Sequence, residues 1–206
     1  MKNVIKLDSN PIVEKIIYEI RHQELQKNRF LYSKNFYLLG IFMAAKTSEY
    51  LEQEKVKVKT VFEEAEHLVL KESPVLVNIL RAGSALISGN QEVFRNSDIT
   101  TIAASRNEET LQCLIHYLAL TEIKNKEVII VDPMLATAGT ASAVCSLLKN
   151  YYPKKIFLQC AFAAPDGISR IQKDHPDVKI IVAVIDQKLN EKGYIVPGFG
   201  DAGDLL

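Results

Sequence analysis

The sequence lacks any apolar run long enough to cross a membrane. A membrane-spanning helix needs about 20 consecutive apolar residues, and no segment of this 206-residue chain approaches that length. The first six residues are not followed by the apolar stretch of a secretory signal peptide. We therefore expect no membrane partner and a cytoplasmic location.

The sequence also lacks net charge. Lysine and arginine together number 25, as do aspartate and glutamate, so the whole chain has no long-range field that would attract a polyanion. Non-specific nucleic-acid binding is therefore disfavoured, and we expect no nucleic-acid partner. A local cationic pocket for a small polyphosphate is still compatible with this balance.

Cysteine is scarce and is not arranged for metal or disulfide chemistry. Cys113, Cys145 and Cys160 are odd in number and widely spaced, and no CxxC pair occurs. This pattern argues against a disulfide framework and against a cysteine-based metal site. We expect the three thiols to pack in the interior, and we expect no dedicated protein metal site.

Hydrophobic periodicity predicts an α/β fold. Apolar residues at helical spacing predict two opening helices, over 12–20 and 30–51. Alternation at 56–59 and the segment 66–70 predict a small β-hairpin. Short apolar runs then alternate with longer segments, which is typical of a parallel sheet covered by helices. The runs are 75–80, 99–103, 128–131, 156–162 and 178–185, and the predicted crossover helices are 82–95, 139–150 and 166–173. We interpret residues 1–206 as a single domain, which at this length buries about 70% of its unfolded surface.

The strongest candidate site follows the strand 128–131. Ligands of open α/β sheets bind beyond the carboxyl ends of the strands, and here a loop from Asp132 to Thr140 leads into a helix. Backbone N–H groups and hydroxyls at Thr137, Gly139 and Thr140 can surround a phosphate, and Asp132 can contact ribose hydroxyls. The loop lacks the GxxxxGK[ST] and GxGxxG motifs. An ordinary turn is the alternative, with Thr140 as helix N-cap and Asp132 as turn former.

Two further strand ends carry arginines. Arg81 follows the run 75–80 and precedes Gly83, and a guanidinium beside exposed backbone amides suits pyrophosphate. Arg106 follows the run 99–103 and is a second candidate for a phosphate-bearing substrate. The alternatives are a solvated arginine at Arg81 and, at Arg106, the start of a charged helix.

The segment 193–204 contains four glycines and a proline within twelve residues. A glycine-rich loop can present backbone N–H and C=O groups to the amide edges of a planar ligand, with Asp201 placed to accept or polarise. The alternative is a poorly ordered C-terminus. We expect order, because Tyr194, Ile195, Val196 and Phe199 offer apolar anchors.

Taken together, these segments resemble the uracil phosphoribosyltransferases in sequence, order and spacing. The motifs are Ile79-Leu-Arg-Ala-Gly83, Arg106-Asn-Glu-Glu-Thr110, Val131-Asp-Pro-Met-Leu-Ala-Thr137, Gly193-Tyr-Ile-Val-Pro-Gly198 and Gly200-Asp-Ala-Gly-Asp204. The resemblance implies a type I phosphoribosyltransferase fold, a parallel sheet flanked by helices with a hood over the base site. It implies transfer of the phosphoribosyl group from 5-phosphoribosyl-1-pyrophosphate (PRPP) to uracil, with Mg²⁺ as cofactor, giving UMP and pyrophosphate. A homodimer or larger homo-oligomer is expected.

The resemblance also implies roles for individual residues. PRPP would be held by Arg81, Arg106, Asp132, Pro133, Met134, Leu135, Ala136, Thr137, Ala138, Gly139, Thr140 and Asp201. Uracil would be recognised, mostly by main chain, at Ile195, Gly200, Asp201 and Ala202. Asp201 and Arg106 are the candidate catalytic residues.

The chain departs from the family pattern near the expected pyrophosphate and phosphate sites. Ala138 stands where the family usually has glycine, so a positive φ there would weaken PRPP binding, whereas a negative φ would make the change nearly harmless. Ser84 and Ser105 also differ from the usual residues, and the short C-terminus predicts a less anchored base loop. A catalytically weak PRPP-binding regulator is therefore the alternative to an enzyme. An RNA-binding regulator is disfavoured by the neutral charge.

Overall fold

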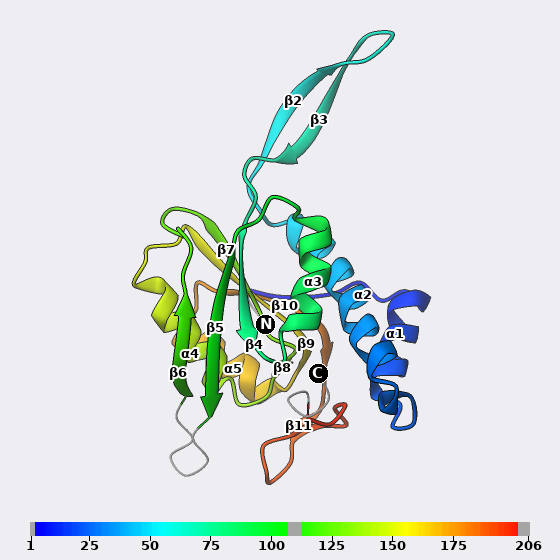
Figure 1. Ribbon diagram of the computed structural model, residues 1–206, viewed down its shortest axis with the longest axis vertical. Helices are drawn as coiled ribbons and strands as arrows, with labels where there is room; N and C mark the ends of the chain where they lie inside the picture. Colours follow the sequence, from blue (N-terminus) through cyan, green and yellow to red (C-terminus); the bar gives the residue numbers. More distant parts are fainter. Residues whose placement is uncertain (1–2, 107–112, 202–206) are drawn as a thin grey trace.

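An eight-stranded sheet forms the centre of the protein. The structure is a computed structural model that describes residues 3–106 and 113–201 (Figure 1). The strand order is β1-β10-β9-β7-β4-β5-β6, with β8 beside β9. Neighbouring strands are parallel except for β5 and β6, which are antiparallel. The strands are β1 (Val4–Lys6), β4 (Val75–Leu80), β5 (Ile99–Arg106), β6 (Cys113–Ala119), β7 (Glu127–Val131), β8 (Met134–Leu135), β9 (Lys155–Ala163) and β10 (Lys179–Ile185).

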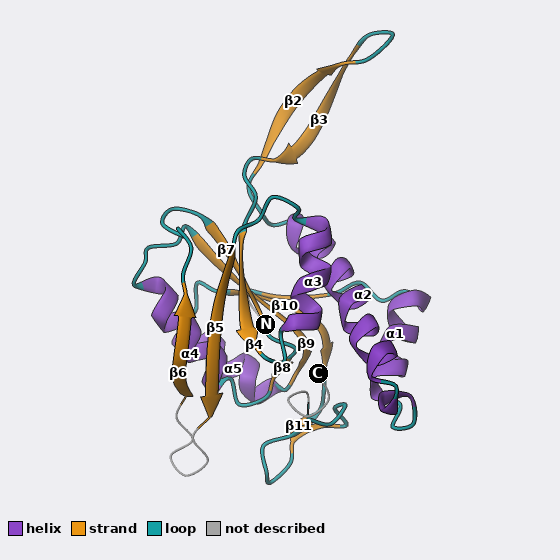
Figure 2. Ribbon diagram, viewed as in Figure 1, coloured by secondary structure: helices purple, strands orange, loops and turns teal. Residues whose placement is uncertain are grey.

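Helices cover both faces of this sheet (Figure 2). One layer holds α1, α2 and α3, and the other holds α4 and α5. The bounds are α1 (Pro11–Arg21), α2 (Arg29–Ser48), α3 (Ser84–Val93), α4 (Gly139–Lys149) and α5 (Pro165–Asp174), with a short 3₁₀ helix η1 (Leu25–Lys27) between α1 and α2. The predicted α/β class and parallel sheet are confirmed.

The continuous apolar runs are explained by burial on two sides. Successive side chains of a strand point to opposite faces, so Leu76 and Ile129 belong to the core that contains α1 to α3. Val77 and Ile130 belong to the core that contains α4 and α5. All four side chains are fully buried, which explains why these positions are apolar on both faces. Asn78, the one polar residue of β4, is only partly buried.

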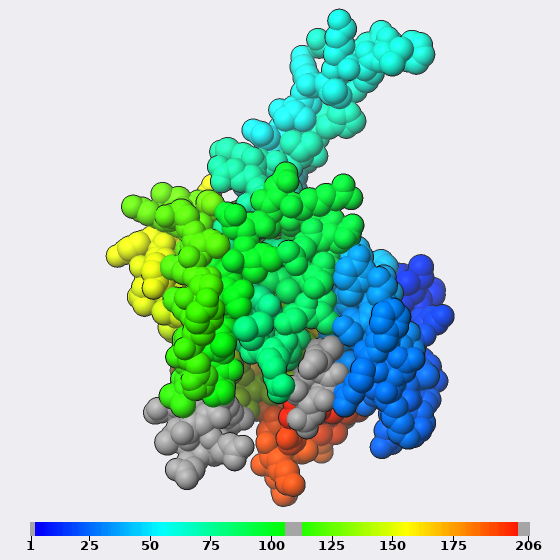
Figure 3. Space-filling view, in the orientation of Figure 1, coloured from blue at the N-terminus to red at the C-terminus, as the bar shows by residue number. Residues whose placement is uncertain are grey.

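A two-stranded ribbon projects from the body of the protein. Strands β2 (Gln53–Lys59) and β3 (Glu64–Leu70) pair antiparallel as predicted, and the ribbon stands clear of the remaining atoms (Figure 3). At its tip the side chains of Val61 and Phe62 are 92% and 95% exposed. Its base is fixed to the body by an ion pair between Lys154 and Glu52.

Strand β6 was not among the predicted strands. It lies at the sheet edge, and most of its side chains, including Leu114 and Tyr117, are exposed although only His116 interrupts its apolar residues. Its register pairs Cys113 with Arg106, which makes Arg106 the last residue of β5. Arg106 itself therefore lies in a strand, and residues 107–112, where the charged helix start of the alternative would lie, are outside the described residues.

Candidate functional site

The loop between β7 and α4 encloses a cavity at the carboxyl edge of the sheet. The cavity has a volume of about 200 Å³. Its lining contains most of the predicted phosphate loop: Asp132, Met134, Ala136, Thr137, Ala138, Gly139 and Thr140, together with Cys113 and Ala141. Pro133 and Leu135 are buried and do not line it. The loop and the helix N-terminus are therefore arranged around a space that a phosphate group fits.

The main chain of this loop is held by hydrogen bonds from β9 and the residue after it, and by close packing against α5. Phe162 and Ala164 donate backbone hydrogen bonds to the carbonyls of Pro133 and Leu135, over 3.0 and 2.9 Å. Helix α5 comes so close that a Cβ added at Gly167 would lie 2.5 Å from the carbonyl oxygen of Ala136. The sheet and α5 thus fix the loop before any ligand binds, as a preorganised anion site requires.

The helix does not begin with a side-chain cap. Helix α4 starts at Gly139, the preceding Ala138 makes no side-chain cap hydrogen bond, and the interpretation of Thr140 as N-cap is wrong. The Thr140 side chain is instead hydrogen-bonded to the Cys113 thiol. Both groups line the cavity, so this hydroxyl lies on the ligand side of the loop.

Ala138 adopts a left-handed conformation. Its φ is +59° and its ψ is +17°, a region that glycine enters freely and alanine does not. The residue is buried and belongs to the core on the α4 side. The positive-φ condition stated for the sequence is therefore met, and the glycine usual in the resembling family has a physical reason.

Asp132 directly follows strand β7 and lines the cavity. Burial raises the pKa of Asp132 to about 7, and the backbone N–H of Met134, 3.5 Å from Oδ1, opposes this shift. The alternative interpretation of Asp132 as a turn former is supported only by this long hydrogen bond from Met134. A carboxyl that titrates near neutral pH is typical of functional sites.

The arginine segments come from the two strands next to β7. Arg81 is exposed just beyond β4, and Arg106 ends β5, so both backbones reach the same sheet edge as the loop from β7. A Cβ at Gly83 would lie 2.8 Å from the carbonyl oxygens of Ile79 and Val131. Glycine is thus needed where the β4 loop crosses β7. Arg81 does not line the cavity, so the cavity covers only part of the predicted PRPP site.

The predicted base loop follows a small hood. Strands β11 (Lys188–Leu189) and β12 (Ile195–Val196) pair antiparallel, and residues 197–201 come directly after them. Ile195 and Phe199 are buried as anchors, whereas Tyr194 is exposed and does not serve as one. Gly198 and Gly200 have φ of +58° and +96°. Ala202 lies outside the described residues.

Asp201 lies close to the N-terminal helices. Its charge contributes to a raised pKa of the Tyr32 hydroxyl, for which burial in α2 is the largest cause. The chain thus brings residue 201 within electrostatic range of residue 32, which spacing in the sequence does not reveal. Asp201 itself is partly buried.

Comparison with known proteins decides the family. A family model described as "Uracil phosphoribosyltransferase" matches residues 7–206. The chain belongs to the uracil phosphoribosyltransferase family. Membership makes it an enzyme of the pentosyltransferase class.

Individual relatives agree with this uracil phosphoribosyltransferase assignment. A uracil phosphoribosyltransferase of Malacoplasma penetrans is 38% identical over 96% of this chain and 95% of its own length. One of Legionella pneumophila is 36% identical over 99% and 95%. The solved structure of the AQ2163 protein from Aquifex aeolicus superposes with a TM-score of 0.90 at 35% identity, covering 98% and 97%. A hypoxanthine-guanine phosphoribosyltransferase from Bacillus anthracis, at 14% identity and a TM-score of 0.53 over 76% and 80%, shares the fold alone.

Cys113 is a cavity residue that sequence reasoning missed. Cys145 and Cys160 are buried and pack in the core as expected, but Cys113 is half-buried and faces the loop of α4. Burial raises the pKa of the Cys113 thiol, and the hydrogen bond from Thr140 opposes that shift. The position follows from the β5–β6 register, for which the sequence carried no signal.

Neither a metal cluster nor a membrane helix occurs in the described part of this uracil phosphoribosyltransferase. Within residues 3–106 and 113–201, no group of three or more His, Cys, Asp or Glu side chains could hold a metal ion. No helix in the same ranges is long and apolar enough to span a bilayer.

Proposed function

We propose that the protein transfers the phosphoribosyl group from PRPP to uracil, giving UMP and pyrophosphate in pyrimidine salvage. The observation that carries this proposal is the cavity between β7 and the N-terminus of α4. Its lining combines helix N–H groups, hydroxyls and a carboxyl group, which are the partners of a ribose phosphate. The full-length match to the family supports uracil as the acceptor base.

PRPP would span the carboxyl ends of three neighbouring strands. Its 5-phosphate would occupy the cavity, held by the backbone and hydroxyls of Thr137, Gly139 and Thr140. Asp132 would contact the ribose hydroxyls, for which its ionised form is the better acceptor. The pyrophosphate would lie toward Arg81 and Arg106. The remaining loop residues of the proposed PRPP site are Pro133, Met134, Leu135, Ala136 and Ala138.

Uracil would be bound by the loop that follows the hood. Backbone groups at Ile195, Gly200 and Ala202 would pair with the polar edge of the base, and Asp201 would contact both base and PRPP. In this arrangement backbone N–H and C=O groups, rather than side chains, would form most of the hydrogen bonds to the amide groups of uracil. Cytosine, with a different donor and acceptor pattern, would be rejected because its polar groups would remain unpaired.

The reaction would proceed by attack of uracil N1 on C1 of the ribose as pyrophosphate leaves. The transition state has oxocarbenium character, so the carboxylates of Asp132 and Asp201 would stabilise positive charge on the sugar. Arg81 and Arg106 would offset negative charge on the departing pyrophosphate. Alignment of base and sugar by the two loops would provide much of the acceleration.

Mg²⁺ is the proposed cofactor. The described residues form no three-ligand cage, but Mg²⁺ often binds through substrate phosphates and water with only one or two carboxylates. Asp132, whose burial raises its pKa to about 7, would be favoured in the ionised form by a nearby cation. Bound Mg²⁺ would neutralise part of the charge of the pyrophosphate.

One observation favours the second candidate, a PRPP-binding regulator with little turnover. Ala138 holds a left-handed conformation at a site where the family usually has glycine. Ala138 lines the cavity, and a Cβ at this position would hinder close approach of a phosphate to the loop backbone.

We also propose a homodimer or larger homo-oligomer. The ribbon of β2 and β3 carries several exposed apolar side chains, and a group of such side chains is typical of a surface that a partner covers. They are Val58, Val61, Phe62, Leu68 and Val69. Absence of a nucleic-acid partner and a cytoplasmic location stay predictions.

PRPP binding with Mg²⁺, measured by calorimetry beside UMP formation, separates the two functions. An enzyme should show both activities, and Thr140→Val should weaken PRPP binding by about tenfold because one hydrogen bond to a charged group is lost. Asp98→Asn, at the opposite end of the strands, is the control and should behave as wild type. Binding without turnover would favour the regulator, and no PRPP binding would contradict both.

A further inference from the structure

The proposed uracil-binding loop is held in place by hydrogen bonds to the backbone of Gly198, two residues before Gly200. The N–H of Gly198 donates to Oδ2 of Asp186 over 3.0 Å, and its C=O accepts a hydrogen bond from Nη1 of Arg21 over 2.7 Å. Gly198 also cannot carry a side chain, because its φ is +58° and an added Cβ would lie 2.2 Å from the carbonyl oxygen of Ile195. Both polar groups of this residue are therefore fixed by two side chains from distant parts of the chain.

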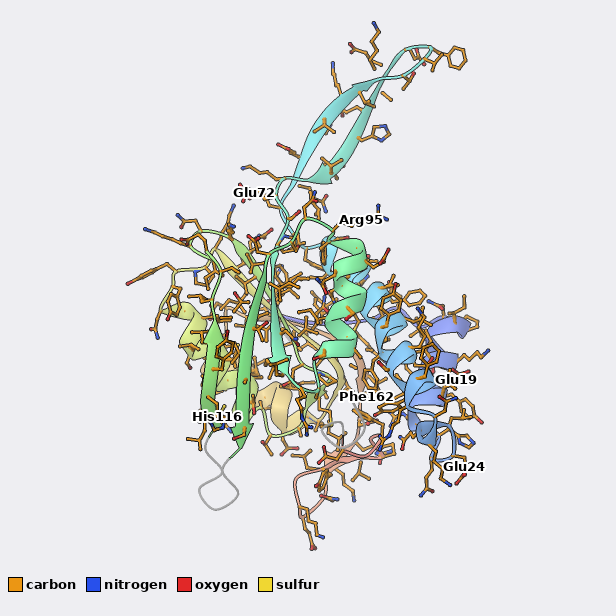
Figure 4. The ribbon with its side chains drawn as sticks, viewed as in Figure 1. Glu19, Glu24, Glu72, Arg95, His116 and Phe162 are labelled. Carbon is orange, nitrogen blue, oxygen red and sulfur yellow. The ribbon has the colours of Figure 1, made fainter. Side chains whose placement is uncertain are left out.

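Those two side chains form a bidentate ion pair. Nη1 and Nη2 of Arg21 lie 3.1 and 2.7 Å from Oδ2 and Oδ1 of Asp186. The Asp186 side chain is only 5% exposed and that of Arg21 24%, so water screens the pair weakly. The guanidinium also lies over the ring of Phe162, 4.8 Å from its centroid. Figure 4 shows Phe162 on the side of the sheet that faces α1 and α2.

A third side chain holds the next residue. Nε2 of Gln26 donates to the carbonyl oxygen of Phe199 over 2.6 Å and to that of Ile20 over 2.7 Å. The buried Phe199 ring packs against Phe162 and Phe36, with centroids 4.5 and 5.5 Å apart. The end of α1 and the segment after it are thus joined to the C-terminal loop, which lies beside them in Figure 1.

The fixed segment ends where the proposed uracil contacts begin. Gly200 and Asp201 follow directly, and Gly200 has a φ of +96°. Glycines give a loop many accessible backbone conformations, whereas recognition by backbone groups requires placement to within about 0.5 Å. The anchors at Gly198 and Phe199 remove that freedom one residue before the contact.

We propose that Arg21, Gln26 and Asp186 are positioning residues for uracil recognition. They touch neither substrate in this arrangement; they act by fixing the backbone of Gly198 and Phe199. This inference rests on the proposed uracil site. It also answers the expectation of a weakly anchored base loop, because the anchoring comes from the N-terminal helices rather than from residues beyond the loop.

Steady-state kinetics on two variants test the role. Arg21→Lys retains the charge but loses the fork that reaches Asp186 and Gly198 together, and Gln26→Met keeps the length but loses both donated bonds. Each should raise KM for uracil by about tenfold, the effect of one well-placed hydrogen bond. KM for PRPP should stay within about twofold, because the phosphate loop is untouched. Lys46→Met is the control, since Lys46 is also mostly buried and ion-paired, with Asp8 and Glu49, away from the base loop.

Each outcome decides the role. A selective rise in KM for uracil in the two variants, with the control unchanged, supports positioning. Equal losses for both substrates that follow a lowered thermal midpoint would show a merely structural role and overturn the inference, as would unchanged kinetics. If Arg21→Lys does not fold, Gln26→Met alone decides by the same criteria. A wild-type protein that makes no UMP would instead refute the proposed function, and the inference with it.

Discussion

Replacing Ala138 with glycine tests the phosphate loop most sharply. Alanine at φ +59° is strained, and the left-handed conformation costs a non-glycine residue about 1–2 kcal/mol. Glycine removes that strain but loses about 0.5–1 kcal/mol through the greater freedom of the unfolded chain. Because the methyl group is buried, its removal loses about a further 0.8 kcal/mol.

These contributions nearly cancel. The free energy of unfolding of Ala138→Gly should therefore change by less than about 1 kcal/mol, and its thermal midpoint by less than about 3 °C. KM for PRPP should fall, because Ala138 lines the cavity and glycine at this position lets phosphate approach the backbone more closely. Ala138→Val is the opposing variant, and a β-branched residue at positive φ in a buried site should lower stability by about 2–4 kcal/mol.

Thermal denaturation and PRPP kinetics of both variants provide the assay. The reasoning would be refuted by Ala138→Gly losing more than about 2 kcal/mol, since a loss of that size implies an unstrained alanine. It would also be refuted by a valine variant as stable as wild type. An unchanged KM for PRPP in the glycine variant would leave the regulator without its supporting observation.

Four further predictions concern Asp132, the loop after β4 and the ribbon. Asp132 is ionised only as pH rises through its raised pKa of about 7, so KM for PRPP should fall between about pH 6 and pH 8, beyond the change due to the phosphate group itself (pKa about 6), and Asp132→Asn should abolish that excess. Because the folded state retains this proton, Asp132 should lower the free energy of unfolding as pH rises from about 3.8 to about 7. Chemical denaturation at several pH values measures this contribution as the difference between wild type and Asp132→Asn, and a contribution that increases with pH would contradict the prediction. Gly83→Ala should lower the thermal midpoint, since its Cβ would lie 2.8 Å from two carbonyl oxygens; an unchanged midpoint would show that the β4 loop can shift. Phe62→Ser at the ribbon tip should shift sedimentation toward monomer without loss of secondary structure, and an unchanged assembly would exclude the tip as the contact.

Burial on both faces made the central strands predictable from sequence. Runs such as 75–80 and 128–131 are almost entirely apolar, with Asn78 the one polar residue, because α2 and α4 cover opposite sides of them. The loop of α4 was predictable for a related reason, since a strand, a small-residue loop and a helix follow one another without interruption. Edge strand β6 was not predicted although only His116 interrupts its apolar residues, because most of its side chains are exposed and burial therefore does not dictate their pattern.

Contacts between distant segments were not predictable. The guanidinium of Arg21 contacts Asp186, which lies 165 residues later in the chain. This contact depends on the packing of α1 beside the segment that follows β10. Cys113 reaches the cavity because β6 pairs with β5 in one particular register. The φ of Ala138 could not be predicted from the sequence. The residue type showed only that a positive φ would be strained.

UMP formation from PRPP and radiolabelled uracil, with Mg²⁺ and purified protein, tests the central claim most directly. Wild type should produce UMP, an excess of unlabelled cytosine should not compete, and Asp201→Ala should lose most of the activity while Asp98→Asn retains it. Absence of UMP from folded wild-type protein that still binds PRPP would contradict the account.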